Sequence, residues 1–274
     1  MHWVEALNND TNLKNMISPL AYVDKEARIG ANVTIHPFAY IDKNVEIGDN
    51  CTIMPYASIL SGTRMGTDNI IYQGAIIGAT PQDFKFKGED TLLKIGNHNT
   101  IREKVILNRG TNTTDCTIIG DGNFLLEGVH LAHDTHLGSH CVLGTGAKTA
   151  GNCIIDDKAI LGSEVIVKHG CRIGSWALLR DGCRANKDVP PYIVAAHNPI
   201  SYYGINALIL AKEGHLTENV IDNIAKCYRQ IYQCGTSLEN ALRRIKDIIP
   251  LSPEITYLVD FIEQSKKGII GTTM

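Results

Sequence analysis

No stretch of the 274-residue sequence comes near the roughly 18 uninterrupted apolar residues that a membrane-spanning helix needs. The sequence also has no excess of positive charge, because 26 Lys and Arg residues face 29 Asp and Glu residues and give a net charge of −3. That balance argues against a nucleic-acid partner. Residues 1–16 contain acidic side chains and no long apolar core, which excludes a signal peptide. These absences predict a cytoplasmic protein with no stable membrane insertion.

What the sequence does have is an aliphatic residue at every sixth position. The series is unbroken from Ile17 to Ile77, and the same phase returns over 95–107, 119–143 and 155–179. A period of six fits neither an α-helix, with 3.6 residues per turn, nor a simple amphipathic strand, with a period of two. It is typical of a solenoid in which each hexad is one short strand and one corner.

The residue two positions before each aliphatic should share its strand face and point into the tube, where little room is left. These residues are mostly small, and five of the eight cysteines are among them: Cys51, Cys141, Cys153, Cys171 and Cys183. Since the sequence contains no C-x-x-C pair, we interpret these cysteines as packing residues. Glycines often follow the aliphatic, which we attribute to corners that need permissive dihedral angles: Gly30, Gly48, Gly66, Gly78, Gly96, Gly120, Gly138, Gly144, Gly162 and Gly174.

The chain divides into three parts. Residues 1–16 form an N-terminal extension, 17–190 a mainly β, parallel β-helix with three faces per coil, and 191–274 a small C-terminal α-helical domain. A loop excursion at 78–94 leaves the repeat and rejoins it in phase, as functional or disordered loops do.

Prolines and capping residues predict how the second half is organised. The Asp-Val-Pro-Pro run at 188–191 is expected to end the strands, because proline cannot donate to a sheet ladder. Helices are expected over 205–211, after a Thr217 cap, after a capping box at 236–239, and after Ser252-Pro253.

The sequence places four histidines close together, at His130, His133, His136 and His140. Such a cluster could indicate a metal site. Residues six apart lie on different faces of such a solenoid, so we expect no metal site within one chain. His133 is the better candidate for catalysis, because a neutral imidazole can remove a proton from a hydroxyl at neutral pH and Asp134 can orient the ring. The alternative is a solvated corner histidine without a role.

Several motifs, in this order along the chain, resemble the UDP-N-acetylglucosamine acyltransferases of lipid A biosynthesis. They are Pro-Gln-Asp-Phe-Lys at 81–85, His-Leu-Ala-His-Asp at 130–134, Asp-Val-Pro-Pro-Tyr at 188–192 and Lys-Gly-Ile-Ile at 267–270. The resemblance covers nearly the whole chain. It implies a left-handed coil, a homotrimer with sites between neighbouring subunits, and no cofactor.

The activity that the resemblance implies is transfer of a 3-hydroxyacyl chain from acyl carrier protein to the 3-hydroxyl of UDP-N-acetylglucosamine. An N-acyl- or acetyltransferase acting on an amino-sugar nucleotide is the closest alternative, and a non-enzymatic solenoid is a third. By resemblance His133 is the general base, assisted by Asp134, and the backbone N–H of Gly151 donates to the oxyanion.

The resemblance also assigns substrate contacts, with departures from the family pattern. Positions that contact the sugar nucleotide match Gln82, Asp83, Lys85, His130, Asn152, His169, Asn206 and Lys212. Lys168-His169 replaces a His-Gln pair, whereas Leu208, Lys212 and Glu213 replace an acid and two arginines. Losing an arginine fork weakens bidentate phosphate recognition.

Acyl-chain length is assigned by resemblance to Leu178, Arg180 and Asp181. Members that accept long chains have two glycines near this position, so two large charged side chains predict a short or medium donor.

Overall fold

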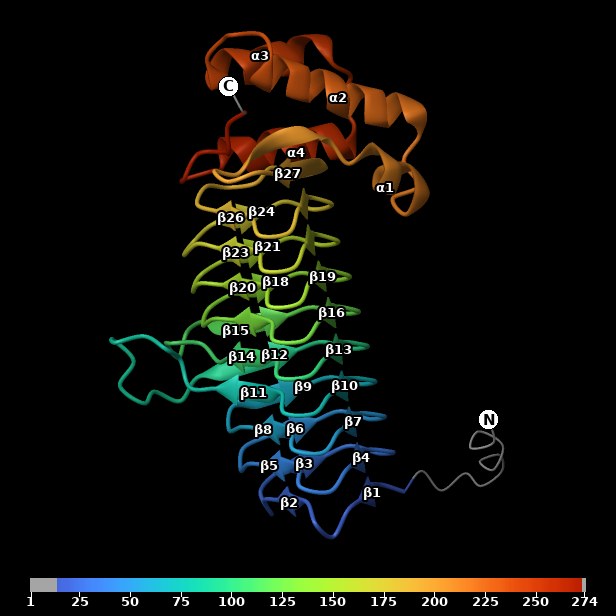
Figure 1. Ribbon diagram of the computed structural model, residues 1–274, viewed down its shortest axis with the longest axis vertical. Coiled ribbons are helices and arrows are strands. Elements are labelled where there is room, and N and C mark those ends of the chain that lie inside the picture. Colours follow the sequence, from blue (N-terminus) through green and yellow to red (C-terminus); the bar gives the residue numbers. More distant parts are fainter. Residues whose placement is uncertain (1–13, 273–274) are drawn as a thin grey trace.

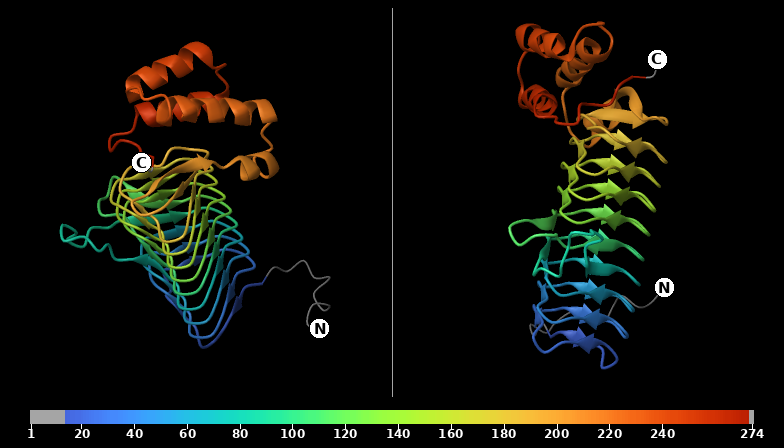
Figure 2. Two further views of the ribbon diagram at one scale, coloured as in Figure 1. Left: turned by 45° about the horizontal axis from the view of Figure 1, so that its top comes forward. Right: turned by 90° about the vertical axis from the view of Figure 1, so that its left-hand side faces the viewer.

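The protein, described here from a computed structural model, forms a long triangular prism of stacked coils with a helical cap at one end (Figures 1 and 2). The structure describes residues 14–272, so most of the expected extension at 1–16 lies outside the described residues. The prism is the parallel β-helix that the repeat predicts, with the left-handed coil that the resemblance implies and one sheet on each of its three faces.

The strands are short and fall into three sheets. The first sheet contains, in spatial order, β1 (Met16–Ile17), β4 (Thr34–Ile35), β7 (Thr52–Ile53), β10 (Ile70–Ile71), β13 (Thr100–Ile101), β16 (Phe124–Leu125), β19 (Val142–Leu143), β22 (Ile160–Leu161), β25 (Leu178–Leu179), β27 (Ile193–Ala196) and β28 (Ser201–Ile205). The second contains β2 (Tyr22–Val23), β5 (Tyr40–Ile41), β8 (Ser58–Ile59), β11 (Ile76–Ala79), β14 (Ile106–Asn108), β17 (His130–Leu131), β20 (Lys148–Thr149), β23 (Ile166–Val167) and β26 (Arg184–Ala185). The third contains β3 (Arg28–Ile29), β6 (Glu46–Ile47), β9 (Thr63–Met65), β12 (Leu92–Ile95), β15 (Cys116–Ile119), β18 (His136–Leu137), β21 (Ile154–Ile155) and β24 (Arg172–Ile173).

Three corners join the sheets within each coil. We call the turn from the first to the second sheet the first corner, the turn from the second to the third sheet the second corner, and the turn from the third to the first sheet the third corner. Aliphatics of the hexad series stack in register from coil to coil, as Ile35 does on Ile53 and Leu125 on Leu143. The small inward residues are buried too, including all five cysteines predicted to pack there, and all are free thiols.

The glycines that follow the aliphatics are needed for space and not for their dihedral angles, which corrects the expectation. Of the ten glycines in that series only Gly78 has a positive φ, whereas the left-handed position is filled by other residues such as Asn32 and Asn50. At Gly138, a Cβ would lie 2.3 Å from Asp157 Oδ1, which accepts a hydrogen bond from the N–H of Ser139 at 2.7 Å. The missing side chain therefore makes room for a carboxylate of the next coil.

The prediction that the strands end at Pro190-Pro191 is wrong. Both prolines are buried at the third corner, where Pro191 packs against Gly174, and no ladder N–H is needed there. The chain then forms β27, parallel to β25, and β28, antiparallel to β27. The predicted helical domain at 191–274 therefore begins with two strands that complete the first sheet.

Four helices close the end of the prism: α1 (Ala207–Lys212), α2 (Glu218–Tyr232), α3 (Leu238–Ile248) and α4 (Pro253–Glu263). The Thr217 and Ser252 caps are confirmed. The cap of α3 is Ser237, whose Oγ accepts from the N–H of Asn240, and not Thr236 as the capping-box spacing predicts. None of these helices, within the residues described, is long and apolar enough to cross a membrane.

Hydrogen bonds from tyrosines fix the helical cap to the prism. The hydroxyl of Tyr257 in α4 donates to Asp156 Oδ2 at 2.6 Å and accepts from the N–H of Ser175 at 2.9 Å. The fully buried Tyr228 in α2 donates to the carbonyl of Pro191 at 2.5 Å. Such bonds place the cap on the last coils as one continuous body.

A ladder of buried asparagines runs inside the tube, in the column of small inward residues that precedes the first sheet. Asn99 Oδ1 accepts from the N–H of Asn123 at 2.8 Å, and the N–H and Nδ2 of Asn99 donate to Asn69 Oδ1 at 2.9 and 3.0 Å. Each amide oxygen thus satisfies a backbone donor that the corner leaves unpaired.

We expect Asn99→Ala to destabilise the protein by about 2 kcal/mol or more, because it leaves the N–H of Asn123 buried without an acceptor. Cys51→Ala is the matched control, since Cys51 lies in the same column and its loss costs only about 1 kcal/mol of packing. Thermal unfolding at one protein concentration compares the two variants. Equal losses of stability would show that the amides serve only to fill space.

Candidate active site

The candidate active site lies at the second corner, where both interruptions of the repeat also begin. His133 and Asp134 follow β17, and Gly151 with Asn152 occupies the same corner one coil on. The two coils are joined by a hydrogen bond from the N–H of Asn152 to the carbonyl of His133 at 3.0 Å. His169 lies at this corner in the next coil, where the N–H of Gly170 donates to the carbonyl of Gly151. Stacking therefore aligns residues that are far apart in the sequence.

His133 and Asp134 form a buried hydrogen-bonded pair. His133 Nδ1 lies 2.8 Å from Asp134 Oδ2, and the Asp134 carboxylate also accepts from the N–H of Thr111 at 2.9 Å and from its hydroxyl at 2.7 Å. Burial by itself would raise the pKa of Asp134, but the hydrogen bonds from Thr111 and His133 hold that pKa below its usual value. An ionised carboxylate only accepts, so Nδ1 must carry the proton and Nε2 is left as the acceptor.

His133 is not the solvated corner histidine of the alternative interpretation, since only 8% of its surface is exposed. The Gly151 backbone lies close against the ring: a Cβ on Gly151 would be 2.4 Å from His133 Cε1 and 2.6 Å from Nε2. Any other residue at 151 would displace the imidazole. Among the described residues, the N–H of Gly151 donates to no protein acceptor, which leaves it available to a substrate oxygen.

The excursion loop brings one of its three predicted residues to the histidine. Asp83 Oδ2 lies 3.8 Å from His133 Nε2, and Asp83 Oδ1 accepts from the N–H of Lys85 at 2.7 Å. The side chains of Gln82 and Lys85 are exposed. Thus Asp83 faces the free nitrogen of His133 from the loop side.

His130 lies on the outward face of β17 and is tied to the base of the loop through a residue that sequence reasoning missed. His130 Nε2 lies 2.7 Å from Asn108 Oδ1, and Asn108 Nδ2 donates to the carbonyl of Thr80 at 2.7 Å. Burial, followed by the charge of Lys148, lowers the pKa of His130, so its imidazole is neutral at pH 7.

Thr111 and Thr117 were missed as well. Thr117 Oγ1 accepts from the N–H of Asp134 at 2.9 Å from inside the tube, opposite the Thr111 contacts. The available signal was the second, smaller interruption of the repeat at Thr113, which marks a longer corner directly below the His133 coil.

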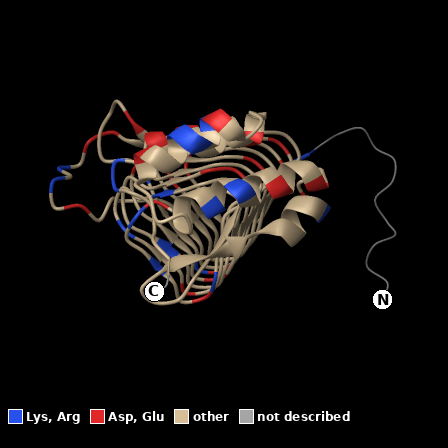
Figure 3. Cartoon of the chain, turned by 90° about the horizontal axis from the view of Figure 1, so that it is seen from above, with Lys and Arg blue, Asp and Glu red and all other residues tan. Residues whose placement is uncertain are grey.

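The remaining predicted residues lie at other corners of the same chain. Arg180 and Asp181 are at the first corner, after Leu178 in β25. Asn206 stands at the N-cap position of α1, where its side chain makes no capping hydrogen bond and instead donates from Nδ2 to the carbonyl of Trp176 at the third corner. Figures 1 and 3 show α1, which ends in Lys212, on the opposite side of the prism from the excursion loop. One chain therefore does not bring these residues to His133.

Asp181 has a structural contact of its own. Its Oδ1 accepts from the N–H of Ser163 at 2.7 Å and fills the space that Gly162 leaves, as Asp157 does at Gly138. The guanidinium of Arg180 lies over the ring of Tyr203, 4.3 Å from its centroid. These contacts hold both side chains in place at the first corner.

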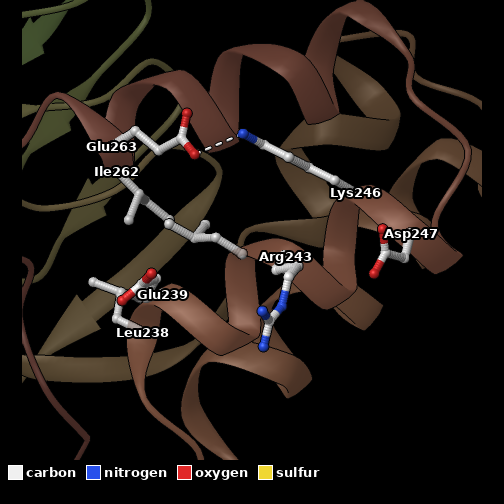
Figure 4. A pocket seen from close by; sticks show the side chains of 8 residues that line it. Leu238, Glu239, Arg243, Lys246, Asp247, Ile262 and Glu263 are labelled. Carbon is white, nitrogen blue, oxygen red and sulfur yellow. Dashed lines mark hydrogen bonds and ion pairs between the residues drawn. The ribbon is translucent and has the colours of Figure 1, made fainter.

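No cluster of metal ligands occurs in the described part of the chain. His130 and His136 lie on different sheets, as the six-residue spacing predicts. A groove of about 520 Å³ between α3 and α4 is far from His133 and is spanned by an ion pair between Lys246 and Glu263 at 2.6 Å (Figure 4). Residues 90–92, 94 and 112–116 line a smaller hollow.

Comparison with known proteins gives consistent matches along the chain. A family model described as UDP N-acetylglucosamine O-acyltransferase, domain 2, matches residues 188–270, and a bacterial transferase hexapeptide model matches residues 44–79. The acyl-[acyl-carrier-protein]–UDP-N-acetylglucosamine O-acyltransferase of Thermodesulfovibrio yellowstonii is 38% identical over 95% of this chain and 99% of its own.

Solved structures agree. The UDP-N-acetylglucosamine acyltransferase of Bacteroides fragilis superposes with a TM-score of 0.91 at 50% identity, covering 93% of this chain and 100% of its own. The Francisella novicida protein of the same name gives a TM-score of 0.90 at 35% identity, covering 93% of this chain and 94% of its own.

Proposed function

The chain belongs to the UDP-N-acetylglucosamine O-acyltransferase family, and we propose that it carries out the family reaction with His133 as the general base. The reaction moves an acyl chain from acyl carrier protein to UDP-N-acetylglucosamine, the first step of lipid A biosynthesis. The observation that carries the proposal for His133 is the fixed tautomer: Asp134 holds the proton on Nδ1, so Nε2 can accept one at the face that Gly151 and Asp83 line.

The proposed chemistry follows from these groups. His133 Nε2 takes the proton of the sugar 3-hydroxyl as its oxygen attacks the thioester carbonyl, and the carbonyl electrons move to an oxyanion. The N–H of Gly151 donates to that oxyanion, a contribution worth about 3 kcal/mol in comparable sites. When the intermediate collapses, the carbon–sulfur bond breaks and the imidazolium returns its proton to the thiolate.

We expect His133→Ala to lower kcat by about 100-fold to 10,000-fold, because the substitution removes the imidazole that lies against Gly151. His136→Ala is the matched control, since that imidazole lies outside on the third sheet. Acyl transfer is measured with acyl carrier protein as donor, and circular dichroism checks the fold. Near-normal turnover of a folded His133→Ala enzyme would reject this residue as the base.

We propose that the protein works as a homotrimer with each site shared between two copies. The positions assigned to the nucleotide and acyl chain lie at the third and first corners, so only a neighbouring chain could present them to His133. The first corner also carries exposed aromatic rings: Phe38 and Tyr56 stack with centroids 5.2 Å apart, and both have positive φ. A bulky residue with left-handed backbone dihedral angles costs about 1 kcal/mol. That cost favours an arrangement in which another copy of the chain covers these rings.

We expect wild-type protein to have a mass near three times the 30.0 kDa chain, and Phe38→Glu to shift it towards monomer while lowering activity. The reason is that a charge would be buried without a partner at the contact. Arg28→Glu, an exposed outward substitution in β3 of the third sheet and not at a corner, is the control and should remain a trimer. Light scattering at micromolar concentration gives the masses; a fully active wild-type monomer would contradict the proposal.

We propose further that Arg180 and Asp181 of one copy limit the acyl chain that extends from the site of its neighbour. Support comes from their size and their fixed positions at the first corner. A hydrocarbon tail gains about 0.8 kcal/mol per buried CH₂, so a groove that ends early removes the advantage of longer donors.

We expect the wild-type enzyme to prefer short or medium donors and Asp181→Gly to shift the preference to longer ones, by up to about fourfold per added CH₂. Asp181→Asn retains an amide oxygen for the N–H of Ser163 and should keep the wild-type preference. Competition between carrier proteins bearing different chains, read by mass spectrometry of the product, compares the variants. An unchanged profile in Asp181→Gly shows that the side chain points away from the groove.

A further inference from the structure

Three buried threonine hydroxyls lie inside the tube directly beneath the His133 corner. Thr117, Thr135 and Thr149 are almost wholly buried. Thr149 is the unusual one, because it occupies an aliphatic position of the hexad series. Its register partners in the adjacent coils of the second sheet are Leu131 and Val167.

The hydroxyl of Thr149 enters the backbone ladder just before His133. In other coils the N–H that starts the second corner donates to one carbonyl, as Leu60 does to Ile77 at 2.8 Å and Ala150 to Val167 at 2.9 Å. At Ala132 the corresponding bond to the carbonyl of Thr149 is 3.4 Å long, and the same N–H lies 3.3 Å from Thr149 Oγ1. The donor is therefore shared between the carbonyl and the hydroxyl.

The hydroxyl of Thr135 connects Thr149 to the carbonyl of Ala150. Thr135 Oγ1 lies 3.3 Å from Thr149 Oγ1 and 3.3 Å from the carbonyl oxygen of Ala150. Only one direction of donation satisfies all the groups: Ala132 N–H donates to Thr149, Thr149 to Thr135, and Thr135 to the Ala150 carbonyl.

That carbonyl belongs to the same peptide group as the N–H of Gly151. A peptide group is planar, so a hydrogen bond that fixes its oxygen also fixes the direction of its N–H. One end of the chain of hydroxyls thus holds the residue before His133, and the other end orients the donor that we assign to the oxyanion.

We propose that the Thr135–Thr149 hydroxyl pair is a positioning element that sets the His133 ring and the Gly151 N–H relative to each other. The proposal rests on the proposed function, because it needs His133 as the base and Gly151 as the donor. Neither threonine touches substrate; each acts through the backbone.

The test is Thr149→Val, which removes the hydroxyl and keeps the shape. Valine already fills this column one coil away at Val167, so the fold should tolerate it. We expect kcat to fall about 10-fold, a factor that corresponds to about 1.4 kcal/mol of transition-state stabilisation. We expect KM for UDP-N-acetylglucosamine to change less than twofold and thermal stability to be unchanged or higher.

Two variants accompany it. Thr149→Ser keeps the hydroxyl and should restore most of kcat, whereas Val167→Thr puts a hydroxyl one coil away and should leave kcat unchanged. A wild-type kcat in Thr149→Val overturns the proposal, and so does a loss of kcat that follows a loss of stability and is not restored by serine. If His133→Ala is inactive while Thr149→Val is normal, only the positioning proposal fails; if His133→Ala is active, the proposed base fails first.

Discussion

Parallel pairing between successive coils is the constraint on which the rest of the structure depends. From β4 to β26, each strand lies on the strand three elements earlier, so each corner lies on the same corner of the coil before it. Because the backbone hydrogen bonds fix this register, a corner can lengthen outward without moving the strands on either side. The second corner lengthens after β11 and again after β14, yet β12 still pairs in register with β9 and β15. Both insertions therefore end beside the His133 corner.

How much the sequence could predict follows from the same register. The aliphatic phase, the small inward positions and the buried cysteines depend only on a period of six, and they could be assigned without knowing how the coil closes. Contacts between coils could not be assigned at the second corner, because the insertions change the spacing. Thr111 reaches Asp134 and Asn108 reaches His130 across distances in sequence that differ from the regular coil. The glycines were located correctly but explained wrongly, since close approach by a neighbouring coil leaves no local signal.

Burial of the Asp134 carboxylate determines the geometry of the site. An isolated buried charge is strongly unfavourable, so it is found only where donors surround it. Here Thr111 supplies two donors and His133 a third, and the N–H of Asp134 is held in turn by Thr117. These bonds leave the carboxylate no rotation that keeps all its partners. The imidazole of His133 is hydrogen-bonded to this fixed carboxylate and is therefore held in place as well. The Gly151 backbone occupies the space on the other side of the ring.

A straight prism has a geometric consequence for any site that needs a base, a nucleotide contact and an acyl groove. Residues at different corners of a coil face away from one another, and no bending of short, fully paired strands can bring them together. Lengthening a corner moves residues such as Asp83 only a short way from their own edge. A second copy placed edge to edge solves the problem without changing either coil, because it presents its first or third corner to the second corner of its neighbour. The stacked rings of Phe38 and Tyr56 then have a physical reason to lie outside, at an edge that the single chain leaves open.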